Sequence, residues 1–141
     1  MSIFALLIVT LAPQPAVTYR ALGNSAAAAH FSGSVWHEKG SIKRAGLVTV
    51  PKAGTKKYSY SILDLEIDCS AWTALPATNT LYDANEKPVS TSVYTAATAR
   101  AIVAGSSVEA HARVVCGRTT LPTAPIPQGA LLKAGLAQLG D

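Results

Sequence analysis

The chain has two cysteines, Cys69 and Cys116, and each one ends a segment with a clear periodicity. A bridge between them would tie together two elements that lie far apart in the sequence. Disulfides persist in oxidising compartments, and they matter most in small domains, which bury little apolar surface. The cysteine pair therefore limits the possible folds more than any other feature of the sequence.

Residues 58–69 alternate between two sets of side chains, as expected for a β-strand. One face ends in an apolar row that consists of Leu63, Leu65, Ile67 and Cys69. The opposite face carries Tyr58, Tyr60, Ile62, Asp64, Glu66 and Asp68. We expect the apolar row to be the covered face of a sheet.

Residues 106–116 have the start and stop signals of a helix. Ser106 and Glu109 form a capping box, and Gly117 stands where a left-handed residue often ends a helix. One helix face consists of Val108, Ala112, Val115 and Cys116. Because both cysteines point toward the layer between strand and helix, we predict a disulfide that clamps this helix onto the sheet. The alternative is a pair of buried free thiols in a cytosolic protein.

Five other segments have the composition of short strands: 31–36, 41–44, 47–50, 72–82 and 87–94. We expect a tight turn at Ala45-Gly46 and a reverse turn at residues 83–86. Pro76 predicts that its strand is bulged there or lies at an edge of the sheet. The predicted fold class is α+β: an antiparallel meander sheet with a C-terminal helix packed on one face and tethered by a disulfide.

Residues 3–12 form an apolar run, and Pro13 and Pro15 follow it. A helix needs roughly 20 residues to span a bilayer, so the run is more typical of a secretory signal peptide. Cleavage is expected near Ala16 or within residues 26–29, and an uncleaved anchor is the alternative. We interpret residues 1–29 as signal peptide or anchor plus a lead-in without pattern, and expect export to the periplasm or cell envelope.

The folded domain is expected over residues 30–118, and residues 119–141 form a Pro-rich tail. The tail ends in a short amphipathic helix over 130–139, whose apolar positions are Leu131, Leu132, Leu136 and Leu139. This helix would suit docking on a partner or on the body of the protein. We expect a loosely attached terminus.

The net charge is +4, with only 14% charged residues. The possible basic binding patch consists of Lys39, Lys43, Arg44, Lys52, Lys56 and Lys57. Folded together, these side chains would attract an acidic protein segment, a glycosaminoglycan or a lipid headgroup; the alternative is a solvated surface. Nucleic acid is not an expected partner, because the cations are few and lack interleaved stacking aromatics.

The sequence gives little support for catalysis. A solvated, ion-paired surface is the favoured interpretation of the carboxylates Asp64, Glu66 and Asp68, because further ligands and a cleft for hydrolysis are not indicated. The histidines His30, His37 and His111 lack metal-ligand spacing. Motifs for a nucleophile elbow, a phosphate loop or a dinucleotide fingerprint are absent. We expect a non-enzymatic protein without a cofactor.

Several short motifs lie in an order that resembles the surface-adhesin protein E-like family of small exported bacterial proteins. They are Trp36 and residues 41–46, 65–69, 82–88, 103–109 and 114–116. The resemblance covers residues 31–117 and implies an antiparallel sheet whose concave face carries a helix tethered by a disulfide. For the founding adhesin it implies binding of host matrix and plasma proteins by a lipid-anchored, dimer-forming chain. This sequence lacks the lipidation cysteine.

We therefore expect a non-enzymatic exported module of the bacterial envelope that binds a protein partner through a sheet surface. The alternative is an accessory subunit of a larger membrane-associated complex, attached by the N-terminal apolar segment and the C-terminal tail. Peripheral membrane association and a homodimer are compatible with both.

Overall fold

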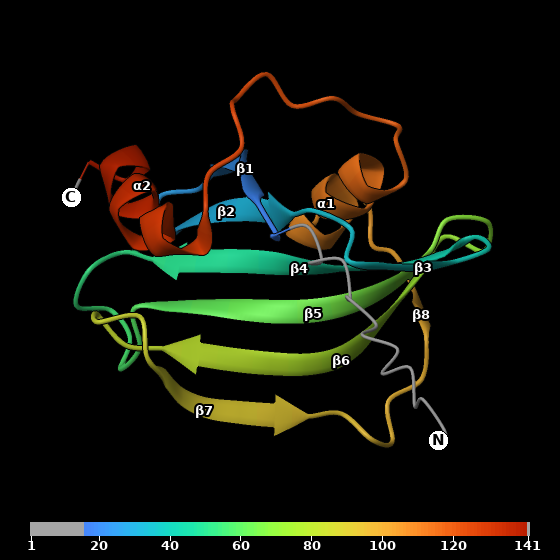
Figure 1. The fold of residues 1–141 in the computed structure, drawn as a ribbon, viewed down its shortest axis with the longest axis horizontal. Coiled ribbons are helices and arrows are strands. Elements are labelled where there is room, and N and C mark those ends of the chain that lie inside the picture. Colours follow the sequence, from blue (N-terminus) through green and yellow to red (C-terminus); the bar gives the residue numbers. More distant parts are fainter. Residues whose placement is uncertain (1–15, 141) are drawn as a thin grey trace, which may run out of the picture.

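The computed structural model describes residues 16–140, so the apolar run at residues 3–12 lies outside the described part of the chain. Its main element is one antiparallel sheet in the order β1-β2-β4-β5-β6-β7, with β3 paired to β4 and β8 paired to β6 (Figure 1). The strands are β1 Tyr19–Asn24, β2 Ala28–Gly33, β3 His37–Lys39, β4 Ile42–Pro51, β5 Tyr60–Asp68, β6 Thr73–Tyr82, β7 Pro88–Val93 and β8 Arg100–Ala101. The predicted antiparallel sheet is confirmed, and it dominates the structure more than an α+β class suggests.

The helical elements all follow the sheet in the sequence. They are α1 Ser107–Val115, the short 3-10 helix η1 Gln128–Ala130 and α2 Leu131–Gln138. Among residues 16–140, no helix combines the length and the hydropathy needed to cross a membrane. Figure 1 shows α1 and α2 close to β2 and β4, whereas β7 lies at the opposite edge of the sheet.

Two buried clusters use alternate residues of the long central strand β4. One cluster contains residues of α1 and consists of Ala45, Leu47, Leu65, Ile67, Ala112 and Val115. The other contains a residue of α2 and consists of Tyr19, Ala29, Phe31, Val48, Val50, Tyr60 and Leu131. Successive side chains of a strand point to opposite faces, so α1 and α2 contact opposite sides of β4. We call these the α1 side and the α2 side.

The predicted disulfide is confirmed, and it links the end of β5 to the end of α1. Cys69 and Cys116 are bridged with a Cα–Cα distance of 5.7 Å. Both predicted helix boundaries are also present: Ser106 Oγ accepts a hydrogen bond from the Glu109 N–H, and Gly117 adopts a φ of 72°. Sequence signals alone therefore located the helix and its covalent attachment.

The expected lead-in over residues 17–29 is wrong, because these residues form β1 and the start of β2. Tyr19 is 5% exposed, and β1 pairs with β2 along its length. The segment is rich in alanine, and small side chains give the two faces of a strand nearly the same hydropathy. The alternation that would indicate a strand is therefore weak. Pairing with β2 and packing of Tyr19 supply the stability that local propensity lacks.

The expected turn at Ala45-Gly46 is also wrong, because β4 continues through both residues. A Cβ at Gly46 would lie 2.7 Å from Ile62 Cγ2, and one at Gly33 would lie 2.9 Å from the Gly46 carbonyl oxygen. Both glycines therefore allow close packing within the sheet. The reverse turn lies earlier, where Gly40 adopts a φ of 62° between β3 and β4.

The C-terminal tail is an integral part of the fold, contrary to the expected loose attachment. Leu131 is completely buried, and Leu132, Leu136 and Leu139 pack around the same cluster. A Cβ at Gly135 would lie 2.6 Å from the side chain of Val50, so the α2 backbone lies directly on β4. The predicted bulge near Pro76 is confirmed by a shift in the β5–β6 register at Asp64 and Leu65.

Candidate functional site

A hollow of about 310 Å³ opens on the α2 side of the sheet, next to the cluster under α2. Its floor includes Gly46 of β4 and Ile62 of β5, and the lack of a side chain at Gly46 deepens it. The surrounding side chains are aromatic or polar: Val17, Tyr19, Trp36, Asp64, Thr78, Thr80, Tyr82 and Gln128. Such a mixture of apolar surface and a few polar groups is typical of binding sites.

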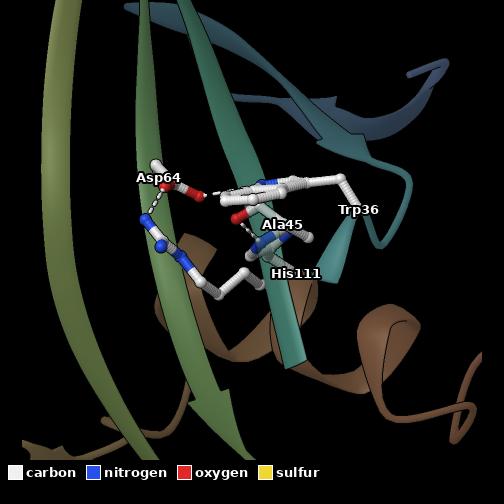
Figure 2. Close-up of polar contacts among 5 residues, drawn as sticks. Trp36, Ala45, Asp64 and His111 are labelled. Atoms are coloured by element: carbon white, nitrogen blue, oxygen red, sulfur yellow. Dashed lines mark hydrogen bonds and ion pairs between the residues drawn. The ribbon is translucent and has the colours of Figure 1, made fainter. Parts of the chain in front are cut away.

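Trp36 stands at this hollow and is fixed by two neighbours on the sheet. The Arg44 guanidinium lies 4.5 Å from the centre of the Trp36 ring, and Asp64 accepts a hydrogen bond of 3.2 Å from the indole Nε1–H. Arg44 also forms an ion pair with Asp64. Figure 2 shows Trp36 and Asp64 facing each other across the strands. The indole remains 47% exposed although its orientation is fixed.

Two tyrosines, Tyr19 and Tyr82, line the hollow, and the completely buried Tyr60 packs against Tyr82. The rings of Tyr60 and Tyr82 stack with centroids 4.7 Å apart, and Gln128 Nε2–H donates to the Tyr60 hydroxyl. Burial, with smaller contributions from Tyr82, Tyr60 and Asp64, raises the pKa of Tyr19 to about 12. Burial also raises the pKa of Tyr60, so Tyr19 and Tyr60 stay neutral near pH 7.

His111 lies on the α1 side and is completely buried. Its Nε2–H donates to the Ala45 carbonyl at 3.2 Å (Figure 2), so its Nδ1 accepts from the Ser32 hydroxyl at 2.8 Å. Burial lowers the pKa of His111 to about 4, against smaller opposing effects of the Ala45 carbonyl and Asp64. The neutral imidazole joins α1 to β2 and β4 and has no access to the hollow.

The carboxylates of β5 take part in structural contacts. Asp64 is held by Arg44 and Trp36, as described above. The Asp68 carboxylate accepts hydrogen bonds from the N–H groups of Ala71 and Ser70 and from the Ser41 hydroxyl. These contacts, with Ala71 and then Ser41 contributing most, lower the pKa of Asp68. Within residues 16–140, no group of three or more His, Cys, Asp or Glu side chains is placed to hold a metal ion.

The six residues of the predicted basic patch fall into two groups at opposite ends of β4. Lys39, Lys43 and Arg44 lie at its beginning; Lys43 contacts Glu38 at 3.7 Å, and Arg44 pairs with Asp64. Lys52, Lys56 and Lys57 follow its end. Lys52 lies nine residue steps after Lys43 along an extended strand, a distance of about 30 Å. The structure therefore does not bring the two groups together.

The second group does line a smaller hollow of about 270 Å³. Lys52, Lys56 and Lys57 surround it together with Leu132 and Leu136 of α2. The three lysines are exposed side chains of one loop. The second group is therefore a solvent-exposed basic surface that lies over the apolar side chains of α2.

The hollow at Trp36 was not predicted from the sequence as a unit. Alternation placed Ile62 and Asp64 on one strand face, and this is the only part of the site that periodicity could reveal. Tyr19 and Gln128 also line the hollow, and they belong to segments that were predicted to be a lead-in and a loosely attached tail. Their approach depends on the antiparallel bridge between Tyr19 and Ile126, whose backbone groups bond reciprocally at 2.8 Å.

Comparisons with known proteins returned no matching family model, no matching curated protein and no matching solved structure. The resemblance to the surface-adhesin protein E-like family stays a prediction.

Proposed function

We propose that this chain is a non-enzymatic, exported binding module of the bacterial cell envelope that holds a segment of a partner protein in the hollow beside Trp36. The observation that carries the proposal is the fixed and half-exposed indole of Trp36, held by Arg44 and Asp64 above a glycine floor. An aromatic side chain that is already ordered loses little conformational entropy when a partner packs against it.

The lining chemistry favours a protein segment as the occupant. Exposed tryptophan and tyrosine rings are enriched at protein interfaces, because they bury a large area and retain a polar atom. Thr78, Thr80 and Gln128 supply hydroxyl and amide groups for a peptide backbone. The charges of Arg44 and Asp64 neutralise each other, so the hollow does not select for a highly charged ligand.

Binding without catalysis is supported by the placement of the titratable groups. The neutral imidazole of His111 and the carboxylate of Asp64 lie on opposite sides of β4, so they cannot act together on one substrate. Export is supported by the disulfide between Cys69 and Cys116, because such bonds persist outside the cytoplasm.

The two tryptophans of the chain allow a direct test of the hollow. Phage-displayed dodecapeptides would be selected on the oxidised protein, and the selected peptides titrated against two single-tryptophan variants. In Trp72→Phe the remaining reporter is Trp36, and we expect its fluorescence to change on binding. In Trp36→Phe the reporter is Trp72, which packs under Arg118 outside the hollow, and we expect no change.

A second variant checks that the site, and not exposed indole in general, holds the peptide. Asp64→Asn removes the charge that orients Trp36 and Arg44, and we expect it to weaken peptide binding by about tenfold, the size of one charge-assisted hydrogen bond. Selected peptides that bind wild type, Trp36→Phe and Asp64→Asn equally would show that the hollow is not the binding site.

The alternative, an accessory subunit of a membrane-associated complex, depends on two attachment points. The tail leucines pack on this chain's own core, which leaves them little apolar surface for a partner. The remaining attachment point would be the apolar N-terminal run, outside the described residues. The binding module is therefore the better supported of the two proposals.

A further inference from the structure

Two adjoining hollows lie at the end of the sheet where α2, the β4–β5 loop and the β6–β7 turn come together (Figure 1). The smaller one, of about 270 Å³, is surrounded by the three lysines of the β4–β5 loop. The larger one, of about 460 Å³, lies between α2 and the β6–β7 turn and has the size of a small-molecule site. Ala84, Leu132 and Leu136 line both hollows, so the two form one groove, which we call the α2 groove.

The floor of the α2 groove is apolar. Leu132 and Leu136 lie one turn apart on α2, and each is partly buried against the core. Ala84 has a small side chain and Gly129 has none, which keeps the larger hollow open. The apolar strip left by the two leucines is small, so it suits a single alkyl chain better than the surface of a second protein.

One end of the α2 groove carries cations that have no counterion in the protein. Lys52, Lys56 and Lys57 are exposed, and in the part of the chain from 16 to 140 none of them takes part in an ion pair. Of the residues that line the groove, Glu86 alone is acidic, and it lines only the larger hollow. An anionic group is therefore attracted to the lysine end and repelled from the other.

The loop that carries these lysines is held by its own backbone. The Lys52 N–H donates to the Ala27 carbonyl at 2.9 Å, and the Lys52 carbonyl accepts from the N–H and the hydroxyl of Thr55 at 3.2 and 2.6 Å. Gly54, in the turn, adopts a φ of 78°. A loop that is already ordered loses little conformational entropy when a ligand binds.

We propose that the α2 groove binds a single-chain lipid with a phosphate monoester as its head group. The phosphate lies among the three lysines, and the alkyl chain lies over Leu132 and Leu136 in the larger hollow. A phosphate monoester carries a charge of about −1.5 to −2 at pH 7 and three acceptor oxygens, which match three ammonium groups. A carboxylate supplies less charge, and a glycosaminoglycan has no alkyl chain for the apolar floor. This site shares no lining residue with the hollow beside Trp36 and does not depend on its function.

Isothermal titration calorimetry of dodecyl phosphate into the full oxidised chain, below the critical micelle concentration, tests the proposal. We expect one molecule to bind per chain, with an affinity that falls as salt is added. Inorganic phosphate lacks the chain and dodecyl maltoside lacks the charge, and each should bind at least about tenfold more weakly. Dodecanoate, with its smaller charge, should also bind more weakly than dodecyl phosphate. Binding of several molecules per chain, or equal binding of dodecyl maltoside, would overturn the proposal.

A triple variant tests the site of the head group. Lys52→Gln/Lys56→Gln/Lys57→Gln removes three exposed charges, and we expect it to weaken the binding of dodecyl phosphate by about tenfold or more. The matched control removes three cations at the opposite end of the sheet and should bind like wild type: Lys39→Gln/Lys43→Gln/Arg100→Gln.

A single variant tests the site of the chain. Ala84 is exposed, so the larger side chain of Ala84→Leu takes no space in the core and fills the junction of the two hollows. We expect it to weaken dodecyl phosphate binding by about tenfold or more, without a change in the urea midpoint. Ala124→Leu, at an exposed position before η1, is the control and should bind like wild type.

Vesicles of phosphatidic acid and phosphatidylcholine distinguish this site from a surface that docks on a membrane. A protein that sediments with these vesicles but does not bind monomeric dodecyl phosphate would contradict the proposal. Binding of dodecyl phosphate that neither the triple lysine variant nor Ala84→Leu weakens would do the same.

Discussion

His111 illustrates how one buried polar side chain can join three segments of a small protein. It donates to the Ala45 carbonyl of β4 and accepts from the Ser32 hydroxyl of β2, while its own backbone belongs to α1. A buried imidazole can make both bonds only when it is neutral, because the protonated ring has two donors and no acceptor. The sequence placed His111 at the border of the apolar helix face but did not indicate its partners.

This requirement predicts a loss of stability in mild acid. The native pKa is about 4, below the unfolded value of 6.5, so the unfolded state binds a proton first as the pH falls. The contribution of His111 is complete above pH 6.5 and is lost progressively toward pH 4, by about 3 kcal/mol. Burial also lowers the pKa of His30, so this residue contributes in the same direction.

Urea denaturation at a series of pH values between 7 and 4 would measure the effect. His111→Gln should be less stable than wild type at pH 7, and its free energy of unfolding should change less with pH. His37→Gln, at an exposed position of β3, serves as the control and should follow wild type. Equal pH dependence in wild type and His111→Gln would contradict the assignment.

Among the secondary-structure elements, β5 and α1 were predicted from the sequence most accurately. β5 alternates between apolar and acidic side chains from Leu63 to Asp68, and α1 has a capping box and a terminal glycine. Both signals are local, and the positions of the two cysteines follow from them. β1 and β4 were described less well, because alanine and glycine obscure the alternation of β1, and Gly46 suggests a turn where the sheet needs a small residue.

The disulfide closes a loop of 47 residues between these two elements. The chain-entropy relation for such a loop gives about 4 kcal/mol, a large part of the roughly 5–15 kcal/mol typical of a domain. Reduction should therefore lower the free energy of unfolding by about this amount, as measured by urea denaturation with and without reductant. The double variant Cys69→Ala/Cys116→Ala should resemble reduced wild type and should not respond to reductant. A wild-type midpoint that reduction does not move would contradict the prediction.

At the scale of the whole molecule, the two ends of the described chain stabilise each other. Tyr19 of β1 pairs with Ile126 of the tail, and both pack on the cluster that contains Leu131. Asn24 also donates to the Gln138 carbonyl of α2. Removal of β1 would expose the edge of β2 and leave part of this cluster uncovered.

The position of β1 separates the two expected cleavage sites. Cleavage within residues 26–29 would remove the whole strand, whereas cleavage near Ala16 would leave it intact. We therefore expect the exported protein to begin close to Val17, as measured by intact mass under non-reducing conditions. Bulky residues block signal cleavage, so Ala16→Leu should preserve the leader, and Ala28→Leu should be processed like wild type. A mature protein that begins after residue 26 would contradict the fold described for β1.

The strand at β5, the capped helix α1 and the disulfide between them could be predicted from the sequence, because these features depend on local periodicity and on two unique cysteines. That β1 and α2 belong to the folded body, and that Trp36, Asp64 and Tyr82 share one hollow, became evident only from the three-dimensional structure. Those contacts join segments that are distant in the sequence, and their stability comes from burial and close approach, for which single residues carry no local pattern. The same reason explains the basic residues: their charge was evident from the sequence, but the length of β4 set the two groups apart.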